Sequence, residues 1–331
     1  MSDNASRATF PPFVPSVPGT IVVALGGNAL SPPGERVTIQ DQFRHTRSSL
    51  GTVVELVETG WGVIIVHGNG PQVGQALTRN ELARDLVEPL PLGVLVAATA
   101  GWIGYMIQQS LQNALIRTGI EREVLTVVTQ TVVSEHDPAL RKPSKPIGNV
   151  LSPERAQRLS SLGIAVGKDG SGRVRRLAPS PRPLEVAESQ AVQRLVAEGV
   201  IVIAAGGGGP PVQRTVESAL EGLDAVVDKD LTAAVLGVAV GASTLLILTD
   251  VDAVYRAWGT AHALPIRSVG VGQARTLVAE GEVGVGSMAP KLEAAALFVE
   301  GGGQRAVIGH LAQGSAALAG ESGTTVKREE I

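Results

Sequence analysis

The chain has 331 residues, is 44% hydrophobic but only 3% aromatic, and carries a formal net charge of −3 at pH 7. This balance of charges excludes a broad electropositive surface, so we expect small-molecule partners and no nucleic acid. Because the chain has no cysteine, disulfides and thiolate metal sites are excluded, and a reducing compartment, the cytoplasm, is favoured.

The N-terminal region predicts two buried strands that each end in a glycine turn. Residues 1–18 contain four prolines and no apolar run, so we expect them to form a disordered leader. A strand is predicted from Thr20 to Leu25, ending in Gly26-Gly27-Asn28. A second is predicted from Gly62 to His67, ending in Gly68-Asn69-Gly70.

The middle of the chain predicts regular elements followed by an irregular insertion. Apolar spacing predicts one helix over residues 43–60, a second over 101–116, and a strand over 124–133. The uncharged stretch 89–116 contains four Gln and Asn residues, so we expect a buried helix and no membrane span. Residues 134–183 are rich in Pro, Gly, Arg and Lys and are too long for an ordinary connection, which predicts a protruding subdomain or active-site lid.

Regular alternation returns in the C-terminal half. A helix is predicted over 186–198, followed by a strand from Val200 to Ala205 that opens into four consecutive glycines, Gly206 to Gly209. Further helices and strands are predicted at 231–249, 273–280, 292–299, 305–308 and 324–326. This alternation, with a core of Val, Leu, Ala and Ile, predicts an α/β fold with a mainly parallel central sheet.

Three predicted strands therefore end in glycines, which is the pattern of an anion site. In an open parallel sheet the carboxyl ends of strands converge on one crevice, where glycines let backbone N–H groups approach a phosphate. Each turn alone is more often a plain turn, and only the recurrence favours a phosphate cradle. Gly68 to Gly74 also approximates a dinucleotide fingerprint, with its last glycine one residue late.

Lysine is rare and selectively placed. The chain has 28 basic residues but only six lysines, and Lys145, Lys229 and Lys291 lie in Ser-Lys-Pro, Asp-Lys-Asp and Ala-Pro-Lys contexts. Phosphoryl transfer depends on compact positive charges and backbone donors around the migrating group, which these lysines could supply. Ordinary surface lysines remain the alternative.

The acidic and imidazole side chains give a weaker signal. Asp228 and Asp230 flank Lys229 and could orient lysines or Mg²⁺, or could cap a helix, and we expect Asp230 only to cap. The five histidines show no metal-ligand spacing, so we expect no protein-held metal site. His67 is as compatible with a structural role as with a functional one.

Eight stretches, which follow one another in the same order along the chain, resemble those of the carbamate kinases of the amino acid kinase family. Only about the first eighteen residues lie outside the resemblance. Ala24 stands where most members of the wider family have a lysine, as in carbamate kinases, and Lys145 is implied to supply the missing charge. The matching stretches are Val22 to Ala29, His67 to Gly74, Ser144 to Gly148, Pro179 to Pro183, Gly206 to Pro210, Asp228 to Asp230, Leu248 to Asp252 and Ser287 to Lys291.

The resemblance implies a three-layer αβα sandwich and a homodimer. An acceptor lobe would span 19–210, including the protruding subdomain at about 134–183, and a nucleotide lobe would span 211–331. The implied reaction interconverts carbamoyl phosphate and ADP with carbamate and ATP, using Mg²⁺. Carbamate is already an anion, so no base is required to deprotonate it.

The resemblance also implies residue roles. Lys145, Lys229 and Lys291 would stabilise the transferred group, and Asp228 would organise the lysines. The phosphoryl and carbamate groups would be held by the glycine turns, namely Gly26, Gly27, Asn28, Gly68, Asn69, Gly70, Gly207 and Gly208. The nucleotide site would be lined by Thr249, Asp250, Val251, Met288 and Pro290.

Two alternatives remain open from the sequence. The first is another small-acid kinase of the same family, such as one acting on acetylglutamate, against which Ala24 argues. The second is a nicotinamide-dependent oxidoreductase, with Gly68 to Gly74 on a pyrophosphate and an acid such as Asp85 on the ribose.

Overall fold

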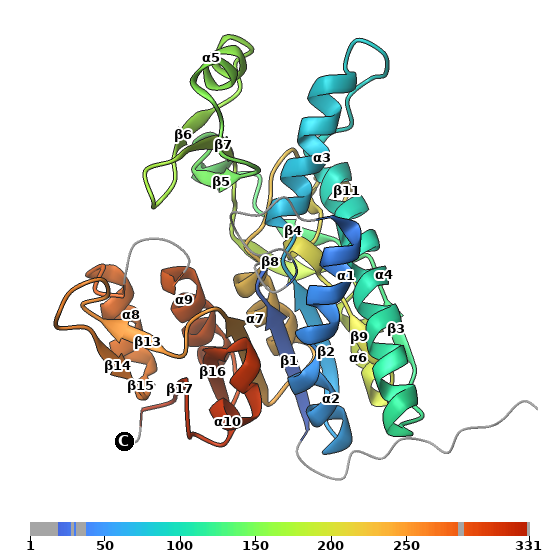
Figure 1. The fold of residues 1–331 in the computed structure, drawn as a ribbon, viewed down its shortest axis with the longest axis vertical. Coiled ribbons are helices and arrows are strands. Elements are labelled where there is room, and N and C mark those ends of the chain that lie inside the picture. The colour runs from blue at the N-terminus through green and yellow to red at the C-terminus, as the bar shows by residue number, and fades with distance from the viewer. Residues whose placement is uncertain (1–18, 28–29, 31–37, 284–287, 330–331) are drawn as a thin grey trace, which may run out of the picture.

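The computed structural model describes residues 19–27, 30, 38–283 and 288–329, so the predicted leader and Asn28 lie outside the described residues. Its centre is an eight-stranded sheet in the order β15-β17-β16-β12-β1-β2-β9-β3 (Figure 1). All neighbouring strands are parallel except β16 and β17. The strands are β1 (Thr20–Leu25), β2 (Gly62–His67), β3 (Val124–Thr126), β9 (Ile201–Ile203), β12 (Thr244–Thr249), β15 (Ser268–Gly270), β16 (Arg305–His310) and β17 (Thr324–Lys327).

Alternating side chains of β1 divide the core into two layers. Val22 and Ala24 belong to the cluster on one face of the sheet, whereas Ile21, Val23 and Leu25 belong to the cluster on the other. The first face is covered by α6 (Ser189–Ala197), α7 (Lys229–Ala239), α8 (Val271–Ala279) and α9 (Met288–Glu300). The second is covered by α2 (Gly51–Glu58), α4 (Leu92–Thr118) and α10 (Gly314–Leu318). The predicted three-layer αβα sandwich with a mainly parallel sheet is confirmed.

Residues 145–178 form a small subdomain that stands away from the body of the molecule (Figure 1). Its three strands pair antiparallel in the order β5-β7-β6, with α5 packed on them. The elements are β5 (Lys145–Ile147), α5 (Pro153–Ser161), β6 (Val166–Lys168) and β7 (Val174–Ala178). This is the protruding subdomain that the irregular insertion predicted.

The smaller sheets lie outside the central one. A four-stranded sheet has the order β11-β10-β4-β8, and a two-stranded one joins β13 to β14. Their bounds are β4 (Thr131–Val133), β8 (Pro183–Val186), β10 (Pro211–Arg214), β11 (Leu220–Gly222), β13 (Val254–Arg256) and β14 (Leu264–Ile266).

The single helix expected over residues 43–60 is wrong. Two helices occur, α1 (Ile39–Ser48) and α2, with a break at Ser49 and Leu50. Ser48 and Ser49 both donate their hydroxyl hydrogen to the carbonyl of His45 at 2.8 Å, and the backbone N–H of Ser49 also bonds there. Serine hydroxyls that bond to the preceding turn offer the backbone an alternative to continued helix, which the apolar spacing did not reveal.

Other predicted elements also differ in extent from those in the structure. The expected strand over 124–133 is two strands, β3 and β4, in different sheets, because Gln130 N donates to Glu188 at 2.7 Å and redirects the chain. The helix predicted to begin at residue 101 begins at Leu92, and the one predicted from Val186 begins at Ser189 after β8. Among the described helices, none, α4 included, has the length and apolarity needed to cross a bilayer.

Candidate active site

The glycine turns after β1 and β2 lie in direct backbone contact. A Cβ built on Gly68 would lie 2.9 Å from the backbone nitrogen of Gly27 and 3.4 Å from Cδ of Lys229. The turn after β1 is also anchored to the next strand, since Gly26 N donates to the carbonyl of Leu248 at 3.2 Å. These close approaches require glycine because any side chain would push the two strand ends apart.

The third glycine turn joins the same place. Gly207 and Gly208 have φ values of +68° and +92°, in the left-handed region that glycine tolerates. A Cβ on Gly207 would lie 2.2 Å from Nδ2 of Asn69, and one on Gly208 would lie 2.4 Å from the carbonyl of Val227. Asn69 is held from behind, because its Nδ2 donates to Oγ1 of Thr99 at 2.9 Å. The structure therefore brings the three predicted turns together, and Gly70 opens α3 (Gly70–Ala83) beside them.

Three lysines from distant parts of the chain meet around two carboxylates. Lys145 comes from β5 of the subdomain, Lys229 is the first residue of α7, and Lys291 lies in the first turn of α9. Nζ of Lys145 lies 2.9 Å from Oδ2 of Asp228. Lys229 pairs with Oδ1 of Asp230, and Nζ of Lys291 lies 3.2 Å from Oδ2 of the same carboxylate.

The structure shows which of the two aspartates caps the helix. Oδ1 of Asp228 accepts the backbone N–H groups of Asp230 at 2.9 Å and Leu231 at 3.3 Å, so Asp228 is the N-cap of α7. Asp230 lies in the first turn beyond the cap, and its side chain turns inward to two lysines. The expectation that Asp230 acts only as a cap is wrong, because the capping position falls two residues earlier. Asp230 is thus a site residue that the sequence pattern missed.

Burial and mutual charge set the protonation of this cluster. Burial raises the pKa of Asp228 and of Asp230, but the neighbouring ammonium groups outweigh it and hold both pKa values below the usual range. Burial lowers the pKa of Lys229. Burial also lowers the pKa of Lys291, but Asp230 and Asp228 overcome this and raise it overall. Three lysines therefore face Asp228 and Asp230, and Asp250 also acts on the charge of Lys291.

A cleft of about 450 Å³ opens beside the cluster at the carboxyl ends of β1, β12 and β16. Of the residues predicted for the nucleotide, Thr249 and Asp250 line this cleft together with Lys229 and Lys291. Val251 follows Asp250 in the chain, and Met288 and Pro290 lie in the turn of α9 that carries Lys291. The lining also includes residues that the sequence pattern did not indicate, namely Ser48, Ser49, His310, Leu311 and Ala312.

His67 is a structural histidine at this site. It is fully buried at the end of β2, and burial lowers its pKa to about 4, so the imidazole is neutral at pH 7. Its Nδ1–H donates to the carbonyl of Gly68 at 3.1 Å. A neutral buried ring that holds a glycine turn supports the cradle without carrying charge.

Comparison with known proteins agrees with this arrangement. Residues 19–310 match the model of the amino acid kinase family. The chain is 41% identical over 313 residues to the carbamate kinase of Pyrococcus horikoshii, covering 94% of this chain and 99% of the relative. It is 44% identical over 307 residues to that of Halobacterium salinarum, covering 92% and 97%.

Solved structures of a carbamate kinase are also similar to this chain. The carbamate kinase of Giardia lamblia bound to citric acid superposes with a TM-score of 0.87 at 32% identity, covering 94% of this chain and 98% of that one. The same enzyme bound to AMP-PNP gives a TM-score of 0.85 over the same shares of the two chains. The chain belongs to the amino acid kinase family and, within it, to the carbamate kinases.

Proposed function

We propose that the protein transfers a phosphoryl group reversibly between carbamoyl phosphate and ADP, giving carbamate and ATP. The observation that carries this proposal is the meeting of Lys145, Lys229 and Lys291 around one pair of carboxylates beside three glycine turns. Membership of the carbamate kinases supports the choice of acceptor and argues against the acetylglutamate and nicotinamide alternatives.

The transfer is a direct in-line displacement. In the ATP-consuming direction a carbamate oxygen attacks the γ-phosphorus, a new P–O bond forms, and the bond to the β-phosphate oxygen breaks to release ADP. Charge spreads over the equatorial oxygens and develops on the leaving oxygen in the transition state, where ammonium groups and backbone N–H donors stabilise it. Carbamate enters as an anion, so no base is needed, and the neutral His67 is not required to accept a proton.

The contacts of the lysine cluster and the family resemblance together support the proposed roles. Lys145, Lys229 and Lys291 surround the migrating phosphoryl group, and Asp228 and Asp230 orient them. Residues 19–210 would form the acceptor lobe and 211–331 the nucleotide lobe. The turns Gly26-Gly27-Asn28, Gly68-Asn69-Gly70 and Gly207-Gly208 would hold the phosphoryl and carbamate groups. The nucleotide would contact Thr249, Asp250, Val251, Met288 and Pro290.

Mg²⁺ fits this site as a partner of the nucleotide. The carboxylates of Asp228 and Asp230 are engaged by lysines, so the described residues favour an ion that arrives on the phosphates, as Mg²⁺ usually does. Asp250 is exposed at the cleft and would be the residue of its lining that supplies a carboxylate to the ion. When bound, Mg²⁺ neutralises charge on the phosphate oxygens.

A coupled assay tests this function directly. Purified protein supplied with ADP, Mg²⁺ and carbamoyl phosphate is expected to produce ATP, and the reverse reaction should consume ATP with carbamate. N-acetylglutamate in place of carbamate serves as the matched acceptor control. Absence of turnover with carbamoyl phosphate, or faster ATP consumption with N-acetylglutamate, would overturn the assignment.

We also propose that the protein acts in the cytoplasm as a homodimer that associates through α4. No charged residue occurs from Leu92 to Ile116, although α4 exposes Val94, Tyr105 and Ile116 at 47%, 56% and 74%. A solvated helix face normally carries charges, so this uncharged surface suits a second copy of the chain.

Tyr105→Glu is expected to weaken dimerisation. Burying an uncompensated carboxylate in an apolar interface costs roughly 3 kcal/mol or more, which raises the dissociation constant about a hundredfold. Sedimentation equilibrium measures this constant. Leu264→Glu, on exposed β14, is the matched control and should remain dimeric. A monomeric wild type, or a variant that associates as tightly as the wild type, would contradict the proposed surface.

A further inference from the structure

The protruding subdomain meets the body of the molecule at a close contact between two glycines. Gly74 of α3 and Gly148 after β5 pack backbone against backbone, since a Cβ on Gly74 would lie 2.0 Å from Cα of Gly148. Ile147 anchors this point in a small apolar cluster with Val73 and Leu77 of α3. Two glycines without side chains form a close contact but do not by themselves fix the angle between the two bodies.

A second contact lies two turns further along the same helix. Glu81 is seven residues after Gly74, so it lies on the same face of α3 about 10 Å away. Its carboxylate forms ion pairs with two guanidinium groups of the subdomain, that of Arg155 in α5 at 2.6 Å and that of Arg176 in β7 at 3.4 Å. Arg155 also donates to Oγ1 of Thr78 at 3.2 Å.

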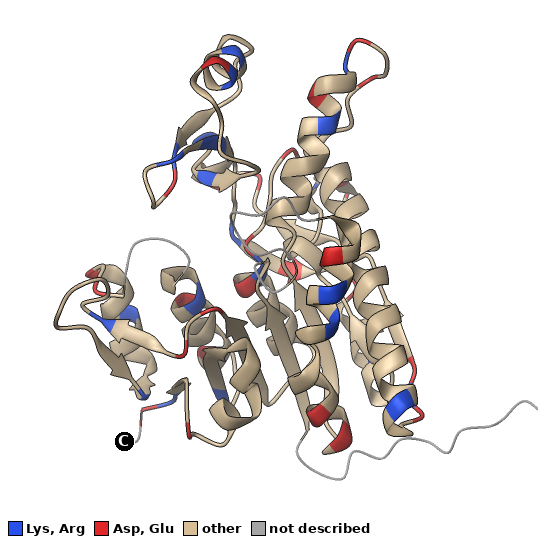
Figure 2. Ribbon diagram, viewed as in Figure 1, with Lys and Arg blue, Asp and Glu red and all other residues tan. Residues whose placement is uncertain are grey.

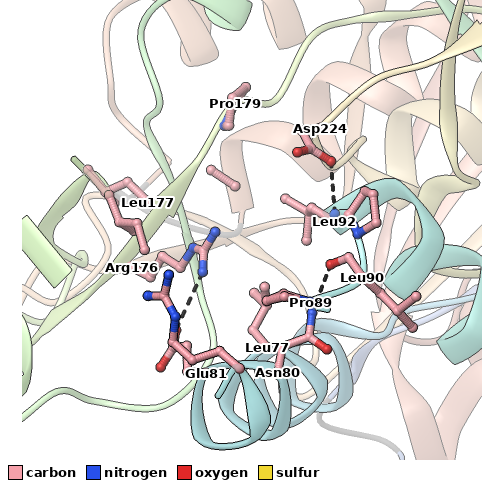
Figure 3. Close-up of a pocket in the computed structure, with 14 residues that line it drawn as sticks. Leu77, Asn80, Glu81, Pro89, Leu90, Leu92, Arg176, Leu177, Pro179 and Asp224 are labelled. Carbon is pink, nitrogen blue, oxygen red and sulfur yellow. Dashed lines mark hydrogen bonds and ion pairs between the residues drawn. The ribbon is translucent and has the colours of Figure 1, made fainter. Parts of the chain in front are cut away.

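These ion pairs border an open cleft between the subdomain and the body of the molecule. A cleft of about 380 Å³ separates the second half of α3 and the segment before α4 from the subdomain, as Figure 3 shows. Glu81 and Arg176 are both only 23% exposed and face each other across its edge. Ion pairs shielded from water are stronger than fully exposed ones.

The strand that Glu81 holds is paired to the strand that carries Lys145. In the register of β5 with β7, Ile147 pairs with Arg176 and Lys145 pairs with Ala178. The ion pair between Glu81 and Arg176 is therefore connected to the backbone of Lys145 by the antiparallel pairing of β7 with β5. The Nζ atom of that lysine lies 2.9 Å from Asp228 in the active site.

We propose that Glu81 is a positioning residue that fixes the angle of the protruding subdomain on α3 and thereby holds Lys145 at the transferred phosphoryl group. Glu81 does not line the cleft that contains Lys229 and Lys291. Its effect on the reaction passes through Lys145, so the inference rests on the proposed kinase function.

The test is a double-mutant cycle in the ATP-forming assay. Glu81→Gln is expected to lower kcat about 10- to 100-fold, with a smaller change in the KM for ADP, because a misplacement of about 1 Å can cost that much. In the Lys145→Ala background the same change should lower kcat less than about twofold, since there is no longer an ammonium group to position. Arg176→Gln should likewise lower kcat when Lys145 is present and have a much smaller effect on kcat in the Lys145→Ala background.

The controls separate positioning from stability and from the function itself. Glu88→Gln, an exposed acid in the segment before α4, should leave kcat unchanged. A purely structural role of Glu81 would lower kcat and the melting temperature equally in both backgrounds, and that result would overturn the proposal. Unchanged kcat in Glu81→Gln would overturn it as well. If Glu81→Gln fails to fold, the Arg176→Gln cycle decides by the same criteria, whereas failure of the wild type to form ATP would reject the proposed function instead.

Discussion

Replacing Lys229 by alanine is expected to lower kcat for ATP formation by about 10²- to 10³-fold, the scale of removing one preorganised charge donor from a transition state. Lys229 lies beside the turns after β1 and β2, since its Cδ lies 3.4 Å from the position of a Cβ on Gly68. The fold should survive, since Asp230 keeps Lys291 as a partner. Initial-rate kinetics and circular dichroism measure the two effects.

Lys142→Ala is the matched control for this prediction. Lys142 belongs to the same insertion as Lys145 but is exposed on the surface, so its removal should change kcat less than about twofold. Turnover by Lys229→Ala within a few fold of the wild type would show that this ammonium group is not part of the transition-state environment.

Replacing Asp230 by asparagine is expected to shift the alkaline limb of the pH profile of kcat/KM to lower pH. The side chain is only 4% exposed and pairs with both Lys229 and Lys291. A carboxylate partner raises the pKa of an ammonium group, so the loss of Asp230 lowers the pKa of both lysines. The lysines then lose their protons at a lower pH than in the wild type. The enzyme therefore loses its activity at a lower pH as well.

The same substitution should also destabilise the fold. Leaving buried ammonium groups without their counter-charge costs about 3–5 kcal/mol, which chemical denaturation at pH 7 measures. Asp85→Asn, an exposed acid after α3, should change neither the pH profile nor the free energy of unfolding. An alkaline limb at the wild-type pH would mean that Asp230 does not set the protonation of these lysines.

The architecture was largely predictable because its signals are local. Apolar runs bounded by glycines located β1 and β2 at their observed bounds, and the loss of periodicity after residue 133 marked the protruding subdomain. Predicted boundaries were wrong where side-chain hydrogen bonds opposed the apolar pattern. Ser48 and Ser49 break a predicted helix in this way, and Glu188 redirects the chain after β3.

The candidate site was predictable only in part. Lys145, Lys229, Lys291 and Asp228 were singled out by their contexts and by family resemblance, and the structure brings them together. The role of Asp230 was missed because the two aspartates that flank Lys229 at the helix start look alike in sequence. Which one caps and which one turns inward depends on where the first helical turn begins.

By itself, the sequence determined the α/β class, the strand ends that carry glycine turns, and the types of charged group available for phosphate chemistry. Only the tertiary structure decided which of those groups lie together in one site. Residues 145, 229 and 291 are far apart in the chain, and only the parallel sheet and the docking of the subdomain on α3 bring their side chains together. Distances of 2.9 and 3.2 Å between charges are set by packing across elements, which no local pattern of residues encodes.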